Sequence, residues 1–282
     1  MRILVTGSEG MVGSEVQKVL RSHGHEVVGY DIRNGQDIRN IQELTTMMQG
    51  CEAVIHLAVS ENEFPESEEM HINLLGTWNV LLAAQSGHVS RVIYMSSVDA
   101  LGVFQGEGIP RYLPIDDQHP TFPRTAYAIG KRLAEDMCKF WSDRTGIPVL
   151  CLRPPGIWTA ETYHRMQKRR AERASEEWDP YWEYGAFLDV RDLAHAVLHA
   201  LSCELTGCST FLIASSDITT SGKTSKELTQ FLHPTIEWRG DNRYESEPFR
   251  SLLVTQPVEQ LLDWTPEFTW QRFINESANT SR

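Results

Sequence analysis

The sequence predicts an α/β fold in which helices cover both faces of a parallel, doubly wound sheet. Short apolar runs alternate with helical patterns through the first half of the chain, and each strand and helix together take about 20–35 residues, as βα repeats do. A glycine-rich turn joins the first apolar run to the first helical pattern at residues 6–13. These observations favour consecutive β–α–β crossovers over separate helical and sheet regions.

The expected elements follow one another in a regular order. We expect strands at 2–6, 25–31, 53–58, 91–96 and 149–153, and helices at 11–22, 41–49, 73–86 and 127–145. After residue 153 a segment rich in charge and tryptophan (159–184) precedes a strand–turn–helix pattern at 187–201 and a strand at 210–214. The predicted division is a sheet domain, 1–155 plus 187–213, and a small C-terminal subdomain, 156–186 plus 214–282.

Composition limits the protein class. The 282 residues are 41% hydrophobic and carry a formal net charge of −12, which would repel nucleic acid and anionic lipid. No apolar run is long enough to span a bilayer, and the N-terminus lacks signal-peptide features. Five cysteines without a CxxC pair argue against a disulfide framework. We therefore expect a cytoplasmic protein without nucleic-acid or membrane partners.

The turn Thr6-Gly-Ser-Glu-Gly-Met-Val-Gly13 has the spacing of a dinucleotide-binding loop. In such a loop Gly7 permits the tight turn, Gly10 lets the backbone approach a pyrophosphate, and Gly13 lets helix and strand pack closely. The N–H groups at the start of the following helix, near Met11 and Val12, face the anion. Together with the strand–helix context, the turn predicts a Rossmann-type domain.

An acidic residue ends the second expected strand. Asp31 lies eighteen residues after Gly13, where a carboxylate bonds the adenosine ribose hydroxyls and repels a 2′-phosphate. NAD is therefore the expected cofactor. Arg33, which follows Ile32, can accommodate a 2′-phosphate, so the use of NADP as well stays open at this point.

Candidate catalytic residues lie on one helix and one strand end. Tyr127 and Lys131 are four residues apart, hence on the same face of a helix. Such a pair alone is common on solvated helix faces. Ser96 and Ser97, however, end the strand at 91–96, and the carboxyl ends of the strands line the ligand crevice of a doubly wound sheet.

In combination these motifs resemble the extended short-chain dehydrogenase/reductase family, the NAD-dependent epimerase/dehydratase group. The resemblance covers residues 1 to about 200 and is specific for the family. It rests on the following residues: the TGxxGxxG turn at 6–13, Asp31, Asp37, Ile38, residues 56–58, Asn73, residues 76–79, Ser96, Ser97, Tyr127, Lys131, Arg153, Pro154 and residues 190–192.

The resemblance implies a role for each matched catalytic position. Tyr127 would be the general acid/base. A free tyrosine has a pKa near 10, and the ammonium of Lys131 and the positive nicotinamide would lower it. Lys131 would also hold the nicotinamide ribose, and Ser97, in preference to Ser96, would bond the substrate oxygen.

The resemblance also implies the cofactor contacts. Asp37 and Ile38 would flank the adenine, while Leu57, Ala58 and Val59 would line the pyrophosphate and ribose. Asn73 would lie near that strand end, and Pro154 and Ile157 would sit by the nicotinamide. No metal ligand spacing such as HExxH occurs among the ten histidines, so no metal site is expected.

The implied activity is NAD-dependent hydride transfer at a secondary alcohol or ketone of a sugar, sugar acid or similar substrate. The first alternative activity is that of a (nucleotide-)sugar 4-epimerase that keeps its NAD bound. The second and weaker alternative is a non-catalytic NAD(P)-sensing protein. Leu101 replaces the tyrosine of a VYG motif, and residues 155–157 lack the YGP continuation of nucleotide-sugar enzymes. A dehydratase needs an acid/base pair after the serine, of which Asp99 supplies one. The resemblance makes a homodimer through helices 73–86 and 127–145 the expected assembly.

Two further patterns have both a functional and a structural interpretation. Basic residues in a predicted helix fit either an anionic substrate or, preferably, a solvated face: Arg165, Lys168, Arg169, Arg170 and Arg173. Aromatic residues fit equally well stacking on a sugar ring or packing of the small subdomain: Trp178, Tyr181, Trp182 and Tyr184.

Overall fold

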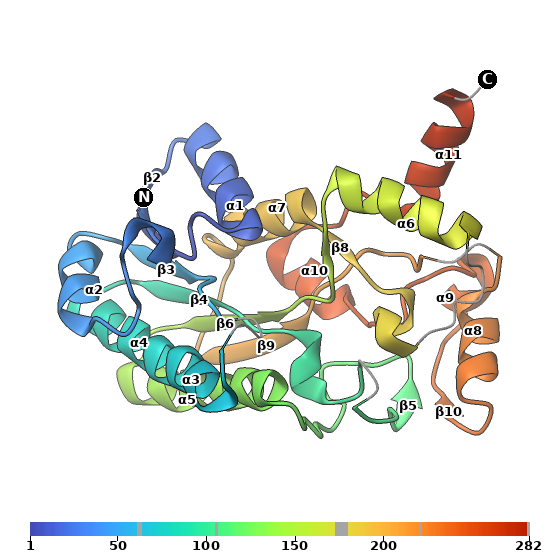
Figure 1. Cartoon of the computed structure of the whole chain (residues 1–282), viewed down its shortest axis with the longest axis horizontal. Coiled ribbons are helices and arrows are strands. Elements are labelled where there is room, and N and C mark those ends of the chain that lie inside the picture. The colour runs from blue at the N-terminus through green and yellow to red at the C-terminus, as the bar shows by residue number, and fades with distance from the viewer. Residues whose placement is uncertain (61–63, 105–106, 173–179, 220–221, 281–282) are drawn as a thin grey trace.

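The centre of the molecule is a six-stranded, all-parallel sheet (Figure 1). The computed structural model describes residues 1–60, 64–104, 107–172, 180–219 and 222–280. In spatial order the strands are β2 (Glu26–Tyr30), β1 (Arg2–Thr6), β3 (Ala53–His56), β4 (Arg91–Met95), β6 (Val149–Arg153) and β9 (Cys208–Leu212). The predicted doubly wound, Rossmann-type fold is confirmed. The last strand begins two residues before the predicted 210–214 segment, an ordinary boundary difference.

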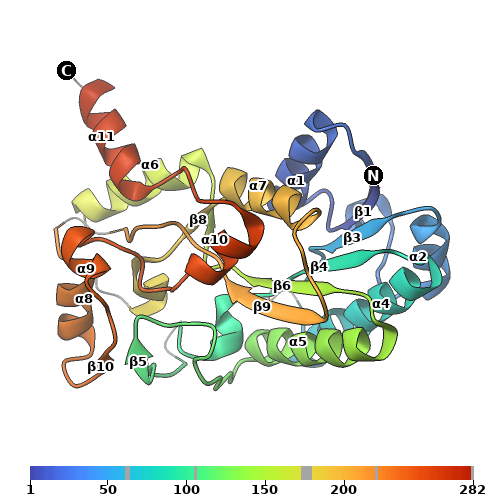
Figure 2. The ribbon, with the colours of Figure 1, turned by 180° about the vertical axis from the view of Figure 1, so that it is seen from behind.

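Helices cover both faces of the sheet. One face carries α1 (Met11–Ser22), α7 (Val190–Ala200) and α10 (Gln256–Leu262), and the other carries α2 (Ile41–Met48), α4 (Gly76–Ser86) and α5 (Ala126–Thr145). In Figures 1 and 2, α1 and α7 lie above the sheet and α4 and α5 below it. Each face of the sheet has its own hydrophobic core, and alternate residues of β1 point into the two cores. Ile3 and Val5 pack on the side of α1, and Leu4 packs on the side of α4.

The helix predicted at 73–86 is longer and interrupted. It begins as α3 (Glu66–Met70), passes through a π turn at His71–Leu75, and continues as α4. Asn73 lies in the π turn, buried, and its Oδ1 accepts a hydrogen bond from the Ser60 N–H at 2.9 Å. The irregular turn thus ties this helix to the chain that leaves β3, a placement frequent for π turns near functional sites.

Small elements surround the end of the sheet that carries its carboxyl termini. β5 (Tyr112–Leu113) pairs with β10 (Glu237–Trp238), and β7 (Ile157–Trp158) pairs with β8 (Leu188–Asp189). Helices α6 (Ala160–Glu172), α8 (Ser225–Leu232), α9 (Arg243–Ser246) and α11 (Trp270–Thr280) complete this part (Figure 1). Residues 98–115 share a core cluster with residues 184–253. The chain before α5 therefore contributes to the packing of the C-terminal part, and the two-domain division at 155 stays a prediction.

The two ambiguous sequence patterns lie in this part of the molecule. Arg165, Lys168 and Arg169 are exposed on α6, and Lys168 lies 4.0 Å from Glu172, in agreement with a solvated face. Arg173 and Trp178 lie outside the described residues. Tyr184 is 2% exposed and packs against Phe104. In the described part of the chain no helix combines the length and apolarity needed to cross a bilayer.

A buried ion pair fixes α5 against the sheet. Glu135 of α5 accepts two hydrogen bonds from the Arg153 guanidinium of β6, at 2.7 and 2.6 Å, and a third from the Ser96 hydroxyl at 2.5 Å. Both charged side chains are nearly inaccessible to water, with Glu135 3% and Arg153 5% exposed. Since these bonds satisfy both charges, their removal leaves an uncompensated buried cation.

Replacement of Glu135 by alanine should therefore lower the free energy of unfolding by about 3–5 kcal/mol, measured by urea denaturation. Lys139→Ala is the matched control on the same helix, because the Lys139–Asp143 pair is exposed and should contribute less than about 1 kcal/mol. Equal costs for the two variants would show that the buried pair does not hold α5 in place.

Candidate active site

A cavity of about 690 Å³ opens at the carboxyl ends of the central strands. Strand order reverses between β1 and β3, the position at which doubly wound sheets bind ligands. Every residue predicted to bind cofactor or to catalyse lines this cavity, with the exception of Asn73: Gly7, Gly10, Met11, Val12, Gly13, Asp31, Ile32, Arg33, Asp37, Ile38, Leu57, Ala58, Val59, Ser97, Tyr127, Lys131, Pro154 and Ile157. Asn73 instead hydrogen-bonds the backbone of Ser60, which does line the cavity.

The glycine-rich turn packs against the end of β3 without room for side chains. Gly7 has φ +69°, and a Cβ on it would lie 2.8 Å from the Ala58 nitrogen. A Cβ on Gly13 would lie 2.1 Å from the Gly7 carbonyl oxygen. The residue before α1 is Gly10, which has no side chain to cap the helix. The first N–H groups of α1 therefore point into the cavity without a side-chain hydrogen-bond partner. This cradle fits a dinucleotide pyrophosphate.

The loop after β2 forms the end of the cavity at which the adenosine is expected; this end is called the adenosine end below. The Asp31 carboxylate accepts hydrogen bonds from the N–H of Glu9 at 2.9 Å and of Arg33 at 2.8 Å, which fixes it beside the glycine turn. The Arg33 guanidinium donates to the Glu9 carbonyl. Gln36 and Arg39 also line this end. Neither residue was predicted from the sequence, because a single residue in a loop belongs to no repeating pattern or motif.

Asp37, which the family resemblance predicts beside the adenine, forms an ion pair at that end. Its Oδ2 lies 2.6 Å from Nη2 of Arg39, and this hydrogen-bonded guanidinium lowers the pKa of the Asp37 carboxyl. Arg39 is also bonded to Glu68 of α3. The ion pair therefore connects the adenosine loop to the helix that covers it.

Helix α5 brings Tyr127 and Lys131 to the opposite end of the cavity. Thr125 caps the helix by accepting a hydrogen bond from the Ala128 N–H. Lys131 is 3% exposed and its Nζ donates to the Met95 carbonyl at 2.7 Å. The same ammonium lies 5.7 Å from the centre of the Tyr127 ring.

His56, at the end of β3, is a buried residue near Lys131 that connects neighbouring elements by hydrogen bonds. Its Nδ1 lies 2.7 Å from the Thr6 hydroxyl and its Nε2 3.0 Å from the Thr77 hydroxyl. Burial, helped by the charge of Lys131, lowers the pKa of His56 to about 3. The imidazole is therefore neutral at physiological pH, and its hydrogen bonds join β1, β3 and α4.

The two serines at the end of β4 have different partners. Ser96 donates to the buried Glu135 at 2.5 Å. Ser97 caps a 3-10 turn at Val98–Leu101: its Oγ accepts from the Asp99 N–H at 3.1 Å and donates to Asp99 Oδ2 at 3.2 Å. The hydroxyl–carboxylate separation at Ser97 is long for this kind of bond, so the Ser97 hydroxyl is the more readily redirected of the two.

Two further carboxyl groups line the end of the cavity that contains Tyr127: Asp99, considered above only for a dehydratase, and Glu183, which has no predicted role. Glu183 belongs to a 3-10 turn at Pro180–Gly185, and its Oε2 accepts a hydrogen bond from the Gly156 N–H at 2.7 Å. Burial raises the pKa of Glu183 to about 8; the Gly156 N–H opposes this shift and the charge of Asp99 adds to it. Glu183 carries no motif, and its presence here follows from the tertiary fold alone.

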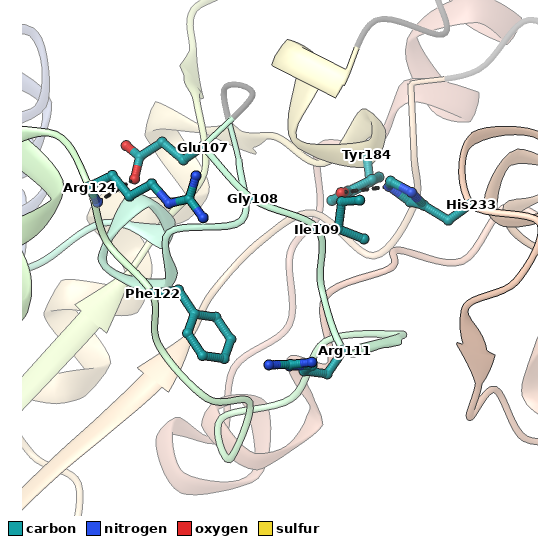
Figure 3. A pocket seen from close by; sticks show the side chains of 8 residues that line it. All are labelled: Glu107, Gly108, Ile109, Arg111, Phe122, Arg124, Tyr184 and His233. Atoms are coloured by element: carbon teal, nitrogen blue, oxygen red, sulfur yellow. Dashed lines mark hydrogen bonds between the residues drawn. The ribbon is translucent and has the colours of Figure 1, made fainter.

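A second cavity, of about 650 Å³, contains none of the predicted residues (Figure 3). Its lining includes Arg111, Phe122, Tyr184 and His233, and the Tyr184 hydroxyl is hydrogen-bonded to His233 Nε2 at 3.0 Å. In the described part of the chain no group of three or more side chains has the arrangement of a metal site.

Known proteins resemble this chain over most of its length. It is 25% identical to a putative UDP-glucose 4-epimerase of Methanocaldococcus jannaschii, over 98% of this chain and 97% of that protein. It is 30% identical to a GDP-6-deoxy-D-mannose reductase of Pseudomonas aeruginosa, over 71% and 70%. A uronate dehydrogenase of Pseudomonas syringae is 27% identical, and there the match spans 54% of this chain and 58% of that protein.

A solved structure is similar to this chain in fold, and a family model matches most of its sequence. A short-chain dehydrogenase/reductase superfamily protein from Agrobacterium tumefaciens, crystallised with bound NAD, superposes with a TM-score of 0.71 at 21% identity, covering 100% of this chain and 97% of that one. The model of the NAD dependent epimerase/dehydratase family matches residues 3–213. The chain therefore belongs to the NAD-dependent epimerase/dehydratase family, whose cofactor is NAD.

Proposed function

We propose that this protein is an NAD-dependent oxidoreductase that acts on a secondary alcohol, or the matching ketone, of a sugar, sugar acid or similar substrate. One observation carries the proposal. The glycine-rich turn, Asp31 and the set Ser97, Tyr127 and Lys131 come from distant parts of the chain, and all of them line one cavity at the strand-order reversal.

The proposed cofactor site extends along this cavity. Gly7, Gly10 and Gly13 leave room for the pyrophosphate, and the N-terminus of α1 attracts its charge. Asp31 retains acceptor capacity for the ribose hydroxyls beside its two backbone partners. Asp37 and Ile38 are assigned to the adenine, Leu57, Ala58 and Val59 to the pyrophosphate and ribose, and Pro154 and Ile157 to the nicotinamide. Asn73 is assigned an indirect role, because its side chain hydrogen-bonds the backbone of Ser60, which lines the cavity.

Proton transfer is assigned to Tyr127. In the oxidation direction its phenolate takes the proton of the substrate hydroxyl, and in reduction it returns a proton to the carbonyl oxygen. Lys131, held by the Met95 carbonyl, stabilises the phenolate. Ser97 turns its hydroxyl from Asp99 to the substrate oxygen and steadies the charge that develops there. Bound NAD supplies the hydride acceptor.

A sugar 4-epimerase is the second candidate. The near full-length similarity to a putative UDP-glucose 4-epimerase favours it, whereas the absence of the YGP continuation at residues 155–157 favours the oxidoreductase. The NAD-sensing alternative is weaker, because Ser97, Tyr127 and Lys131 are all retained and all line the cavity. A sensor has no need of an acid/base set.

A homodimer through α4 and α5 is part of the proposal. Large apolar side chains stay exposed on α5 and on the π turn that precedes α4, with Leu75 40%, Leu133 42% and Phe140 69% accessible. Such a surface suits burial against a second copy. A cytoplasmic location stays a prediction from the sequence.

The first test is Tyr127→Phe. The loss of the phenol proton should reduce kcat about 10²–10⁴-fold and leave NAD affinity within about twofold, since the ring remains. The assay supplies NAD to a panel of aldoses, uronates and nucleotide sugars and follows NADH and epimer formation. Net NADH marks an oxidoreductase, and epimer without net NADH marks the second candidate.

Tyr112→Phe is the control for this test, because Tyr112 lies in β5 and is not among the residues that line the cavity. Its activity should match that of the unaltered enzyme. Full turnover by Tyr127→Phe would refute the assignment of Tyr127 as the acid/base.

The second test concerns the cofactor. Asp31→Asn removes the charge that repels a 2′-phosphate, and its single amide oxygen can still accept from one of the two N–H groups, that of Glu9 or that of Arg33, which bond different oxygens of Asp31. KM for NAD should rise about tenfold or more, because charged hydrogen bonds to the ribose are lost, and the efficiency with NADP relative to NAD should increase. Asp143→Asn, on the exposed part of α5, controls for the lost charge. An unchanged NADP/NAD ratio would contradict the role of Asp31.

A further inference from the structure

The end of the cavity that contains Ser97 and Tyr127 is called the catalytic end below, and one carboxyl group there follows from no motif. Glu183 lines this end together with Gly156, in the segment after β6 at which the nicotinamide is expected. Asp99 lines it as well, hydrogen-bonded to Ser97, and its charge acts on Glu183. Glu183 therefore belongs to the group of residues that surround the expected position of the substrate.

The backbone places Glu183 here at a conformational cost. Glu183 and Tyr184 have φ +50° and +57°, followed by Gly185 at +77°. Left-handed backbone is uncommon for residues other than glycine and concentrates at functional sites. The turn puts consecutive side chains into different cavities, Glu183 into the catalytic end of the first and Tyr184 into the second (Figure 3).

Hydrogen bonds on both sides hold this turn in place. The hydroxyl of Tyr184 is hydrogen-bonded in the second cavity, and the Gly185 carbonyl accepts from the Thr219 N–H at 2.8 Å. On the other side the Gly156 N–H donates to Oε2 of Glu183 at 2.7 Å. The C-terminal part and the strand end thus fix the carboxyl group together, and one of its two oxygens is occupied as an acceptor.

The second carboxyl oxygen of Glu183, Oε1, remains available. It makes no hydrogen bond within the part of the chain that the structure describes. It is not enclosed either, because the unpartnered oxygens closed off from solvent belong, among the described side chains, to Ser60 and Glu69. An accessible oxygen on a fixed carboxyl group in this cavity is placed to contact a bound ligand.

Within the described residues, no cation forms an ion pair with the carboxyl group of Glu183. The basic residues that line the cavity there are Arg33, Arg39 and Lys131. Arg33 and Arg39 belong to the adenosine end, and the Lys131 ammonium donates to the Met95 carbonyl. A carboxylate that is partly removed from water and lacks a cationic partner is costly, so such a group takes up a proton more readily.

The pKa of Glu183 agrees with a neutral acid. Burial is the largest influence and raises this pKa to about 8, the charge of Asp99 adds to the shift, and the Gly156 N–H opposes it. Among the described residues, the 3-10 turn after β4 contributes Asp99, and the segment after β6 contributes no titratable side chain. Helix α5 contributes Tyr127 and Lys131 to the same cavity end, and neither is hydrogen-bonded to Glu183. At physiological pH the group is therefore mostly protonated.

We propose that Glu183 is a substrate-binding residue, which donates a hydrogen bond from its free carboxyl oxygen to a substrate oxygen other than the reacting one. This inference rests on the proposed function and adds a residue to its substrate site. Gly156 occupies the acceptor oxygen, so the proton lies on the oxygen that faces the ligand. A neutral donor suits a hydroxyl, carbonyl or carboxylate oxygen. Ser97 and Tyr127 serve the reacting oxygen, and Glu183 fixes a second point of the molecule.

The test measures how the affinity for substrate depends on pH. The enzyme–NADH complex is titrated with aldoses, uronates and nucleotide sugars and followed by NADH fluorescence; NADH avoids the positive nicotinamide, which would itself act on Glu183. Since the folded-state pKa is about 8, the donor is present below that pH and is lost above it. The substrate Kd should therefore rise about tenfold between about pH 7 and about pH 9.

Two variants separate a donor from an acceptor. Glu183→Gln keeps a donor at every pH and an acceptor for Gly156, so it should bind about two- to fivefold more weakly near neutral pH and lose the rise above it. Glu183→Leu has neither group and should raise Kd about tenfold or more at neutral pH, without pH dependence. Glu245→Gln, at an exposed glutamate on α9, should keep the profile of the unaltered enzyme.

The outcomes separate the inference from the proposed function. A Kd that stays constant or falls as the pH rises, or a rise that Glu183→Gln shares, overturns the inference and leaves the oxidoreductase assignment standing. The profile of the unaltered enzyme decides this even if a variant is poorly folded, as judged by its Tm. Binding that depends on Glu183 as expected, without net NADH from any substrate, supports the inference and refutes the oxidoreductase assignment. Failure of every compound to bind overturns both.

Discussion

The three hydrogen bonds of Glu135 hold the catalytic geometry together. One carboxylate on α5 binds Arg153 of β6 and Ser96 at the end of β4, so the helix, its neighbouring strand and the strand end keep one relative position. Tyr127 and Lys131 lie within two turns of Glu135 on the same helix, and Ser97 directly follows Ser96. A buried carboxylate between a guanidinium and a hydroxyl has few alternative arrangements. The distance between Tyr127, the proposed acid/base, and Ser97, the proposed partner of the substrate oxygen, therefore depends on this contact.

The second constraint is the close approach of backbones where the strand order reverses. The glycine turn lies against the chain leaving β3, so that even a methyl group on Gly7 would touch Ala58. This packing exposes the N–H groups of α1 to the cavity and supplies positive potential without a charged side chain. In a chain of net charge −12, this local positive potential, with Arg33 and Arg39 as nearby basic residues, suits the dianionic pyrophosphate of the proposed cofactor.

The cavity is consequently polarised from end to end. Basic side chains and helix N–H groups gather at the adenosine and pyrophosphate end, and Asp99 and Glu183 at the catalytic end. Lys131 lies at the same end as Tyr127, and its charge also acts on His56. The relatives act, by their names, on uronates, on arabinose and on nucleotide sugars, and residues outside the shared motifs must separate such substrates.

The sequence alone determined the parallel sheet, the glycine turn, Asp31 and the Tyr127/Lys131 pair, because each depends on local spacing: two residues per strand repeat, four per helix turn, or glycines where no Cβ fits. Ser97 could be placed because it ends a recognisable strand. The tertiary structure decided the rest. The π turn that directs Asn73 to Ser60, the bond that commits Ser96 to Glu135, and the entry of Glu183 beside Asp99 all join segments tens of residues apart. No local pattern encodes such contacts, since they arise only when the sheet and its C-terminal elements pack together.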